Sequence, residues 1–110
     1  MSIHIGSTSI ERGCVTAAAA IVGAKWTPQI LYALCNDICR FCELQKDVAG
    51  INPRTLSARL DELEEAGIVT KESYDEMPPR IEYTLTEKGR DLVPILEKMI
   101  EWGEKHPAGC

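Results

Sequence analysis

Hydrophobic residues recur at the three- and four-residue spacing of an amphipathic helix through most of the chain, and they alternate with polar residues only in residues 68–85. We therefore expect a series of helices, a β-hairpin and a final helix. The expected helices span residues 14–23, 28–36, 41–48, 53–67 and 87–106, and the expected strands span residues 68–74 and 80–85. Gly23 should end the first helix, and Pro94 should kink the last.

Polar residues with capping side chains precede three of these helices. Thr27 and Asn52 each stand directly before a proline, which is typical of an N-cap followed by the first helical residue. Thr86 occupies the same capping position before the last helix. Between the two expected strands lies the sequence DEMPP, which suits a hairpin tip because its prolines cannot donate ladder hydrogen bonds.

The order of these elements predicts the fold class. Two short helices, a tight turn, a longer helix and a hairpin indicate an α+β, mainly α protein, a winged helix-turn-helix with a two-stranded wing and terminal dimerisation helices. At 110 residues, the chain is expected to form a single domain over residues 1–110. Residues 1–13 would be an N-terminal arm, and residues 107–110 a mobile tail.

The last expected helix carries apolar side chains on more than one face. They are Leu92, Val93, Ile95, Leu96, Met99, Ile100 and Trp102. A monomer would not expose so wide an apolar band, so the pattern favours packing against a second copy in a homodimer. The alternative is an ordinary core helix.

Composition and charge narrow the classes of function. No apolar run approaches the roughly 18 residues that span a bilayer, and no cleavage signal is visible, so we expect a cytoplasmic protein with no membrane partner. Neither His4 nor His106 lies near a nucleophile or a carboxylate pair, so we expect no enzyme.

The two halves of the chain differ in charge. Residues 1–60 carry six Lys or Arg against four Asp or Glu, and residues 61–110 carry six against thirteen. A DNA-binding surface would therefore come mainly from the first half.

The chain resembles the HxlR-type transcription regulators, which are MarR-like winged-helix proteins, in four stretches: CVTAAAAIVGAKWTPQILYAL, RFCEL, GINPRTLSARLDELEEAGIV and PPRIEYTLTEKGRDLVPILEKMIEWGEKH. The resemblance runs from Cys14 to His106. It implies a homodimeric, DNA-binding, non-enzymatic regulator, and in many members the cysteine that matches Cys14 senses oxidants or electrophiles. The chain departs from the family at Val15, where proline is usual, and in the turn before RF, where it has Asp-Ile in place of Gly-Pro.

The helix from Pro53 to Ala66 is the expected DNA-reading helix. Its buried stripe would consist of Leu56, Leu60 and Leu63. Arg54, Ala58 and Asp61 would then point outward, flanked by Thr55, Ser57 and Arg59. Arg54 is the candidate for reading a guanine through two hydrogen bonds, and Ala58 or Thr55 could touch a thymine methyl group.

Other basic residues are candidates for contacts to the DNA backbone. Arg80, beyond the expected wing tip, suits a contact to a phosphate or to the minor groove. Lys25, Arg40 and Lys46 could bind phosphates. The alternative for each of these residues is an ordinary solvated charge.

Five cysteines are many for a chain of this length, and their odd number argues against a structural disulfide framework. Cys14 is expected just before a helix, where free N–H groups and the helix dipole favour the thiolate, so it is the candidate redox-sensing residue. Its alternative role is that of a small buried residue at the dimer interface. Cys110 lies in the expected tail and is assigned no role.

Cys35, Cys39 and Cys42 have the spacing C-x-x-x-C-x-x-C and span a helix end, a turn and the next helix start. The turn could gather the three sulfurs to bind an iron–sulfur cluster or, as a second choice, zinc, with Cys14 or a non-cysteine group as fourth ligand. The spacing also matches that of radical-SAM enzymes, but the chain is too short for their barrel. In the HxlR-type family these positions tend to hold other residues. The other interpretations are a thiol-based switch, in which Cys14 acts alone or pairs with one of the three, and inert thiols.

The sequence therefore favours a dimeric, redox-responsive DNA-binding regulator. Two hypotheses from other classes stay open at this point. One is a metal- or electron-carrying protein, and the other is a protein-interaction module, each on a winged-helix scaffold that does not bind DNA.

Overall fold

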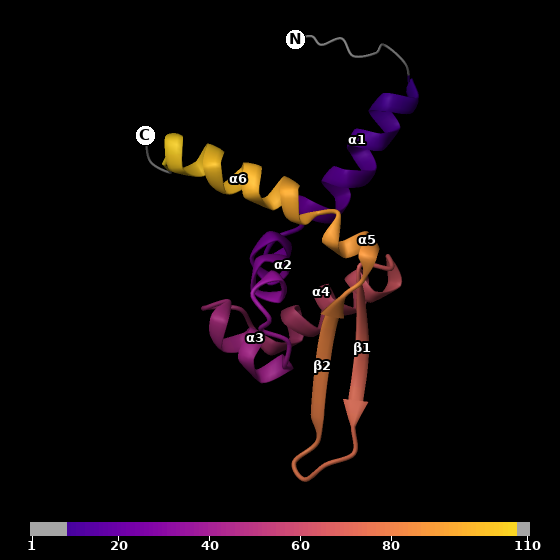
Figure 1. Ribbon diagram of the computed structural model, residues 1–110, viewed down its shortest axis with the longest axis vertical. Coiled ribbons are helices and arrows are strands. Elements are labelled where there is room, and N and C mark those ends of the chain that lie inside the picture. Colours follow the sequence, from indigo (N-terminus) through magenta and orange to yellow (C-terminus); the bar gives the residue numbers. More distant parts are fainter. Residues whose placement is uncertain (1–8, 108–110) are drawn as a thin grey trace.

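The computed structural model describes residues 9–107, with side chains from residue 13 onward. Its helices and strands follow the predicted order (Figure 1). The elements are α1 (Ser9–Val22), α2 (Thr27–Cys35), α3 (Phe41–Asp47), α4 (Pro53–Glu65), β1 (Val69–Tyr74), β2 (Arg80–Leu85), α5 (Glu87–Arg90) and α6 (Val93–Lys105). The mainly helical fold with a two-stranded antiparallel wing confirms the predicted class.

Helix α4 begins as its sequence predicts. The Asn52 side-chain oxygen accepts hydrogen bonds from the backbone N–H groups of Arg54, at 2.7 Å, and Thr55, at 3.3 Å. Pro53 occupies the first turn, where its missing N–H is no loss. On the inner face of the helix, Leu56, Leu60 and Leu63 are all buried, which confirms the predicted stripe. The other face is left for solvent or a ligand.

The hydrophobic core lies where α2, α3 and α4 meet the base of the hairpin. Leu44, Leu56 and Leu60 are completely buried there, together with Ile30 of α2. Helix α6 joins this core mainly through Leu96, which packs against α2. Helices α2, α3 and α4 are thus fixed to one another by side chains that water does not reach, and this fixes the direction in which α4 points.

The wing is a hairpin with one further attachment to the helical body. β1 pairs with β2 from Val69↔Leu85 at the base to Tyr74↔Arg80 near the tip. On the other edge of β2, Arg40 forms an isolated bridge with Glu82, and the Tyr83 N–H donates to the carbonyl oxygen of Cys39 at 2.8 Å. The turn between α2 and α3 therefore acts as a short third strand that holds the wing.

The N-terminal helix differs from the prediction. Helix α1 begins at Ser9, so residues 9–13, expected as part of an arm, are helical. Cys14 lies within the helix and not before it, and the thiolate stabilisation expected from a free helix N-terminus does not apply there. Helix α1 ends at Val22, directly before Gly23 as expected. The rest of the expected arm, residues 1–8, and residues 108–110 of the expected tail lie outside the described residues.

Two further boundaries differ from the prediction. Thr27 is the first residue of α2 and is buried, and the capping position belongs to Trp26, in a left-handed conformation with φ 78°. The last expected helix is two helices, because the chain turns between α5 and α6. Pro94 lies in the first turn of α6, where proline is tolerated, and it does not kink a longer helix. The Thr86 cap is confirmed, since its oxygen accepts from the Gly89 N–H at 3.1 Å.

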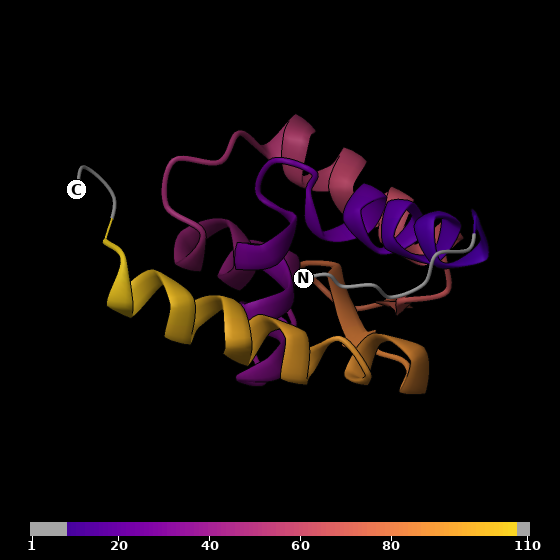
Figure 2. The same cartoon turned by 90° about the horizontal axis from the view of Figure 1, so that it is seen from above.

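Helices α1 and α6 extend from the end of the molecule opposite the wing tip (Figure 1). Seen from above, they run in different directions from the body (Figure 2). From Gly13 to Ala20 every described residue of α1 is exposed. Over the described residues, no helix combines the length and apolar character needed to cross a bilayer.

Candidate nucleic-acid interface

The outer face of α4 presents one long cation among short side chains. Arg54, Ser57 and Ala58 are exposed, and Thr55 is half-buried beside them. They occupy the N-terminal half of a helix whose opposite face is locked into the core. A guanidinium beside small hydroxyl and methyl groups can donate two hydrogen bonds to a guanine edge while the helix backbone approaches closely. The structure brings these predicted residues together on one surface.

Arg59 has an internal role that the sequence analysis missed. Its Nε donates to the carbonyl oxygen of Lys25 at 2.9 Å, and its Nη1 pairs with Glu62 at 3.1 Å. This guanidinium ties the α1–α2 turn to α4 and is already engaged on two sides. Lys25 is exposed next to this tie, and its ammonium lies 5.3 Å from the centre of the Trp26 ring. Of the two predicted cations, Lys25 is the more available to a phosphate.

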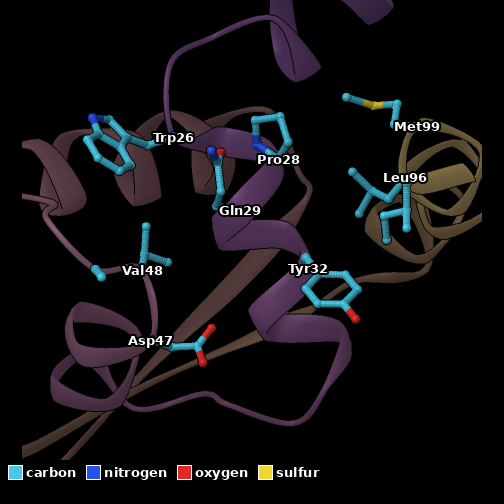
Figure 3. A pocket seen from close by; sticks show the side chains of 10 residues that line it. Trp26, Pro28, Gln29, Tyr32, Asp47, Val48, Leu96 and Met99 are labelled. Carbon is cyan, nitrogen blue, oxygen red and sulfur yellow. The ribbon is translucent and has the colours of Figure 1, made fainter. Parts of the chain in front are cut away.

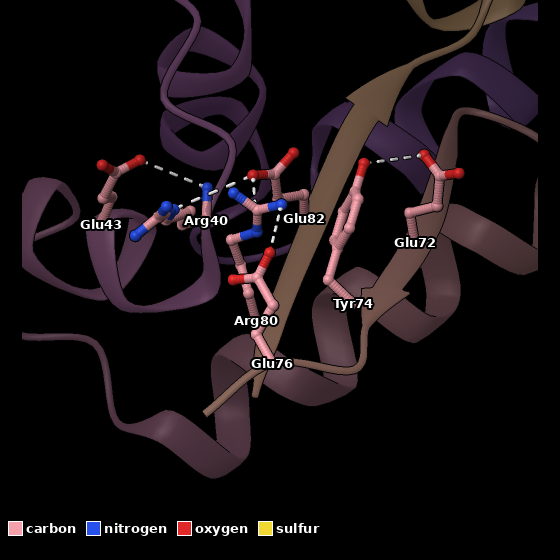
Figure 4. Close-up of polar contacts among 7 residues, drawn as sticks. All are labelled: Arg40, Glu43, Glu72, Tyr74, Glu76, Arg80 and Glu82. Carbon is pink, nitrogen blue, oxygen red and sulfur yellow. Dashed lines mark hydrogen bonds and ion pairs between the residues drawn. The ribbon is translucent and has the colours of Figure 1, made fainter. Parts of the chain in front are cut away.

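The predicted wing contact, Arg80, lies in a cluster of charged and aromatic side chains (Figure 4). Its Nη2 pairs with Glu76 at 3.0 Å, and its guanidinium carbon lies 4.1 Å from the centre of the Tyr74 ring. The buried Nε lies 3.4 Å from Glu82 as an ion pair without an aligned hydrogen bond. Arg40 Nε approaches the same Glu82 oxygen at 3.8 Å. The structure therefore gives Arg80 and Arg40 partners that hold the wing against the α2–α3 turn.

Two exposed lysines have no such engagement. Lys46 is exposed on α3, as a phosphate contact would need. Lys71 is exposed on β1, and among the described residues no acidic side chain forms an ion pair with it. Sequence reasoning missed Lys71, although its place in the first wing strand was a usable signal. It is the wing cation best placed for a phosphate.

The structure separates the cysteines that the sequence groups together. Cys35 and Cys39 are half-buried and line one cavity of about 360 Å³, whereas Cys42 and Cys14 are exposed elsewhere. Within residues 13–107, whose side chains the structure describes, no three metal-ligating side chains form a group that could hold a metal ion. The described residues therefore do not support metal binding by Cys35, Cys39 and Cys42, and it stays a sequence prediction.

The surroundings of the two half-buried thiols favour the protonated form. Burial raises the pKa of Cys35, and the carboxylate of Glu97 adds to this. Burial also raises the pKa of Cys39, with further contributions from Glu82 and Glu43. Because the thiolate is the nucleophile in thiol chemistry, neither thiol is poised to react at neutral pH. The exposed thiols are the better candidates for oxidation.

Comparison with known proteins agrees with this geometry. The family model described as HxlR-like helix-turn-helix matches residues 21–108. An uncharacterized HTH-type transcriptional regulator from Halalkalibacterium halodurans is 43% identical over 88 residues, which are 79% of this chain and 78% of the relative.

Two solved structures are similar over most of their length. A transcriptional regulator of the MarR family from Enterococcus faecalis V583 has a TM-score of 0.76 at 34% identity, covering 94% of this chain and 93% of that one. The redox regulator HypR in its reduced form has a TM-score of 0.80 at 39% identity, covering 86% and 94%. The family match and the relatives lead to one conclusion: this chain belongs to the HxlR-like helix-turn-helix family and is a transcriptional regulator with a winged-helix fold.

Proposed function

We propose that the protein binds specific sites in double-stranded DNA as a homodimer, with α4 in the major groove. The observation that carries the proposal is the outer face of α4, where a capped and firmly anchored helix presents Arg54 among Thr55, Ser57 and Ala58. Lys25, Lys46 and Lys71 supply exposed cations on other elements for the phosphates. The acidic C-terminal half of α4, with Glu64 and Glu65, would point away from the duplex.

The second copy of the chain would cover α1 and the outer side of α6. Val15 of α1 is 68% exposed, and on α6 Ile95 and Trp102 are 42% and 65% exposed. Ile95 and Trp102 are seven residues apart and so lie on the same side of the helix. Apolar side chains left open on two helices at one end of the molecule are typical of a self-complementary dimer surface. This surface lies opposite the wing tip (Figure 1).

Arg54→Ala tests the groove assignment. On a duplex selected by the wild-type protein from a random pool, we expect a loss of about fivefold to 160-fold in affinity, the value of one bidentate guanine contact of about 1–3 kcal/mol. Binding to an unrelated duplex should fall much less. Gel-shift or fluorescence-anisotropy titrations at fixed salt measure both affinities.

Arg90→Ala is the matched control for this experiment. It also removes one positive charge, but Arg90 is exposed on α5, outside both α4 and the proposed dimer surface. The DNA affinity of this variant should stay within about twofold of that of the wild type, since a remote surface charge contributes little at moderate salt. Equal losses of DNA affinity in both variants would show a general charge effect and would contradict the placement of α4 in the major groove. Failure of the wild-type chain to select any duplex would overturn the proposal of DNA binding itself.

The proposed DNA binding responds to oxidation through the exposed thiols, with Cys14 as the first to react. The similarity to the redox regulator HypR supports this assignment. Cys14 is exposed on α1, which belongs to the proposed dimer surface, and Cys42 is exposed at the start of α3. A disulfide from Cys14 to Cys42 of the partner subunit would link the dimer helices to the DNA-reading motif. The two thiols would lose two protons and two electrons, and an added organic disulfide would accept them and become two thiols.

A non-reducing gel after treatment with an organic disulfide tests this pairing. In a Cys110→Ser background, we expect a covalent dimer with Cys14 and Cys42 intact. The dimer should be lost in Cys14→Ser and in Cys42→Ser and kept in Cys39→Ser, because burial raises the pKa of Cys39 and slows its reaction. A dimer that survives Cys42→Ser but not Cys14→Ser would mean a Cys14–Cys14 bridge and would contradict the proposed pair.

A further inference from the structure

A cavity lies between helix α2, the α3–α4 turn and helix α6 (Figure 3). Its volume of about 640 Å³ is within the range of roughly 300–1,000 Å³ typical of small-molecule sites. Apolar and aromatic side chains form most of its wall. Its lining residues are Trp26, Pro28, Gln29, Tyr32, Asp47, Val48, Ala49, Leu96, Met99 and Ile100. None of these residues belongs to the proposed DNA-reading face of α4.

Charge is confined to one side of this cavity. Asp47, the last residue of α3, is the only charged side chain in the lining, and its carboxylate is directed toward the space in front of Tyr32 (Figure 3). No ion pair to Asp47 occurs in the part of the chain that the structure describes. The Tyr32 ring is half-exposed on the opposite wall, and the Gln29 amide is directed away from both residues, toward Trp26 and Pro28. The cavity thus combines a broad apolar wall with one carboxylate.

We propose that this cavity binds a lipophilic organic cation, an aromatic ammonium or phosphonium compound of drug-like size. Apolar surface on Leu96, Met99 and Val48 would take the hydrocarbon part of such a ligand. The carboxylate of Asp47 would neutralise its charge, and the face of the Tyr32 ring attracts cations through its quadrupole. A lipophilic anion would meet the same apolar wall but would be repelled by Asp47, so the sign of the charge distinguishes the proposed ligand class.

The proposed dimer surface borders this cavity at Met99, which lines the cavity and lies four residues from Ile95. Leu96 and Ile100 are four residues apart and face the cavity, whereas Ile95 and Trp102 lie on another side of α6. A ligand in the cavity would contact α6 and the α3–α4 turn at the same time. This turn leads directly into α4. If the proposed function holds, such a ligand would set the position of the DNA-reading helix relative to the dimer helix, but binding itself does not depend on that function.

The test uses two probes of nearly the same shape and opposite charge, tetraphenylphosphonium and tetraphenylborate. Isothermal titration of the full chain without DNA should show the cation binding about tenfold more tightly than the anion, because Asp47 is exposed and an exposed charge pair contributes little more than it does in water. Asp47→Asn should remove this preference and leave weak, charge-independent binding. Tyr32→Ala should weaken the cation further.

Asp91→Asn is the matched control, because it changes the net charge equally but lies outside the cavity, between α5 and α6. This variant should keep the tenfold preference for the cation. That result would distinguish a specific site at Asp47 from general attraction of cations to a chain of net charge −5. Any one of three results would overturn the proposal. The two probes bind equally, the preference for the cation survives Asp47→Asn, or neither probe binds because a second copy of the chain fills the cavity. None of these outcomes bears on the Arg54 experiment, which needs no ligand.

Discussion

Leu60→Ala is expected to lower the free energy of unfolding by about 2–5 kcal/mol, a large part of the roughly 5–15 kcal/mol that stabilises a domain of this size. Leu60 is completely buried in the middle of α4, between Leu56 and Leu63. Alanine would leave a cavity there, since the neighbouring side chains belong to elements already fixed by the rest of the core. The same residue holds α4 in place, so the DNA affinity expected from the proposed function should fall together with stability.

Urea unfolding followed by circular dichroism measures this loss, at equal protomer concentration because assembly contributes to stability. Ser57→Ala is the matched control on the exposed face of the same helix. It should change the free energy of unfolding by less than about 0.5 kcal/mol. If Leu60→Ala unfolded at nearly the same urea concentration as the wild type, the packing of α4 against the core would be wrong.

Gly89→Ala is the second change with a large expected effect, about 3 kcal/mol of destabilisation. A Cβ atom at this position would overlap the carbonyl oxygen of Ile68 and lie 3.1 Å from Leu85 Cδ2. The Ile68 oxygen cannot move aside, because it also accepts the Thr86 backbone N–H at 2.9 Å. Close packing of α5 on the start of β1 therefore requires glycine, and alanine would push the two elements apart.

Gly103→Ala is a control that should change the stability in the opposite direction. Gly103 lies inside α6, and a Cβ atom there would meet nothing within 4 Å. Alanine should stabilise the helix by about 0.5–1 kcal/mol, because it has less backbone freedom to lose on folding. Thermal unfolding of the two variants side by side should move the midpoint in opposite directions. A Gly89→Ala protein as stable as the wild type would contradict the contact between α5 and Ile68.

The sequence was most informative where a local signal and the tertiary structure agree. At α4, the Asn52-Pro53 start and the leucine spacing together determine both the boundary and the buried face, so the outward position of Arg54 follows from the residue pattern alone. Leu85 and Tyr83 of the wing are buried in the same way, at alternate positions along β2. These signals depend on neighbours within a few residues.

The sequence was less informative where partners distant along the chain decide the outcome. The first two turns of α1 contain Ser9 and Gly13, which are weak helix formers, so its start could not be seen from propensity. For Arg80, which stays a predicted wing contact, nothing in the sequence shows that Glu82 stands between it and Arg40. The close approach at Gly89 is equally invisible, since Ile68 is far from it in the sequence.

The cysteines show the same limitation. The spacing of Cys35, Cys39 and Cys42 gives the distance along the chain and not the direction of each sulfur. In the structure, the pairing of the α2–α3 turn with β2 leaves Cys39 beside the cavity that Cys35 lines, and the first turn of α3 leaves Cys42 exposed. When a motif spans a helix end, a turn and a helix start, the relative positions of its side chains can therefore be predicted only once the geometry of the turn is known.

The exposure of α1 has a consequence for how the proposed sensor would behave at different abundances. A helix of 14 residues that packs on little else is marginal in water, so most of the stability of α1 would have to come from a second protomer. Folding of α1 and assembly would then be one coupled equilibrium. At low concentration the chain around Cys14 would be a solvated coil, and at high concentration a helix against the partner. The rate at which this thiol is oxidised would follow the amount of protein as well as the amount of oxidant.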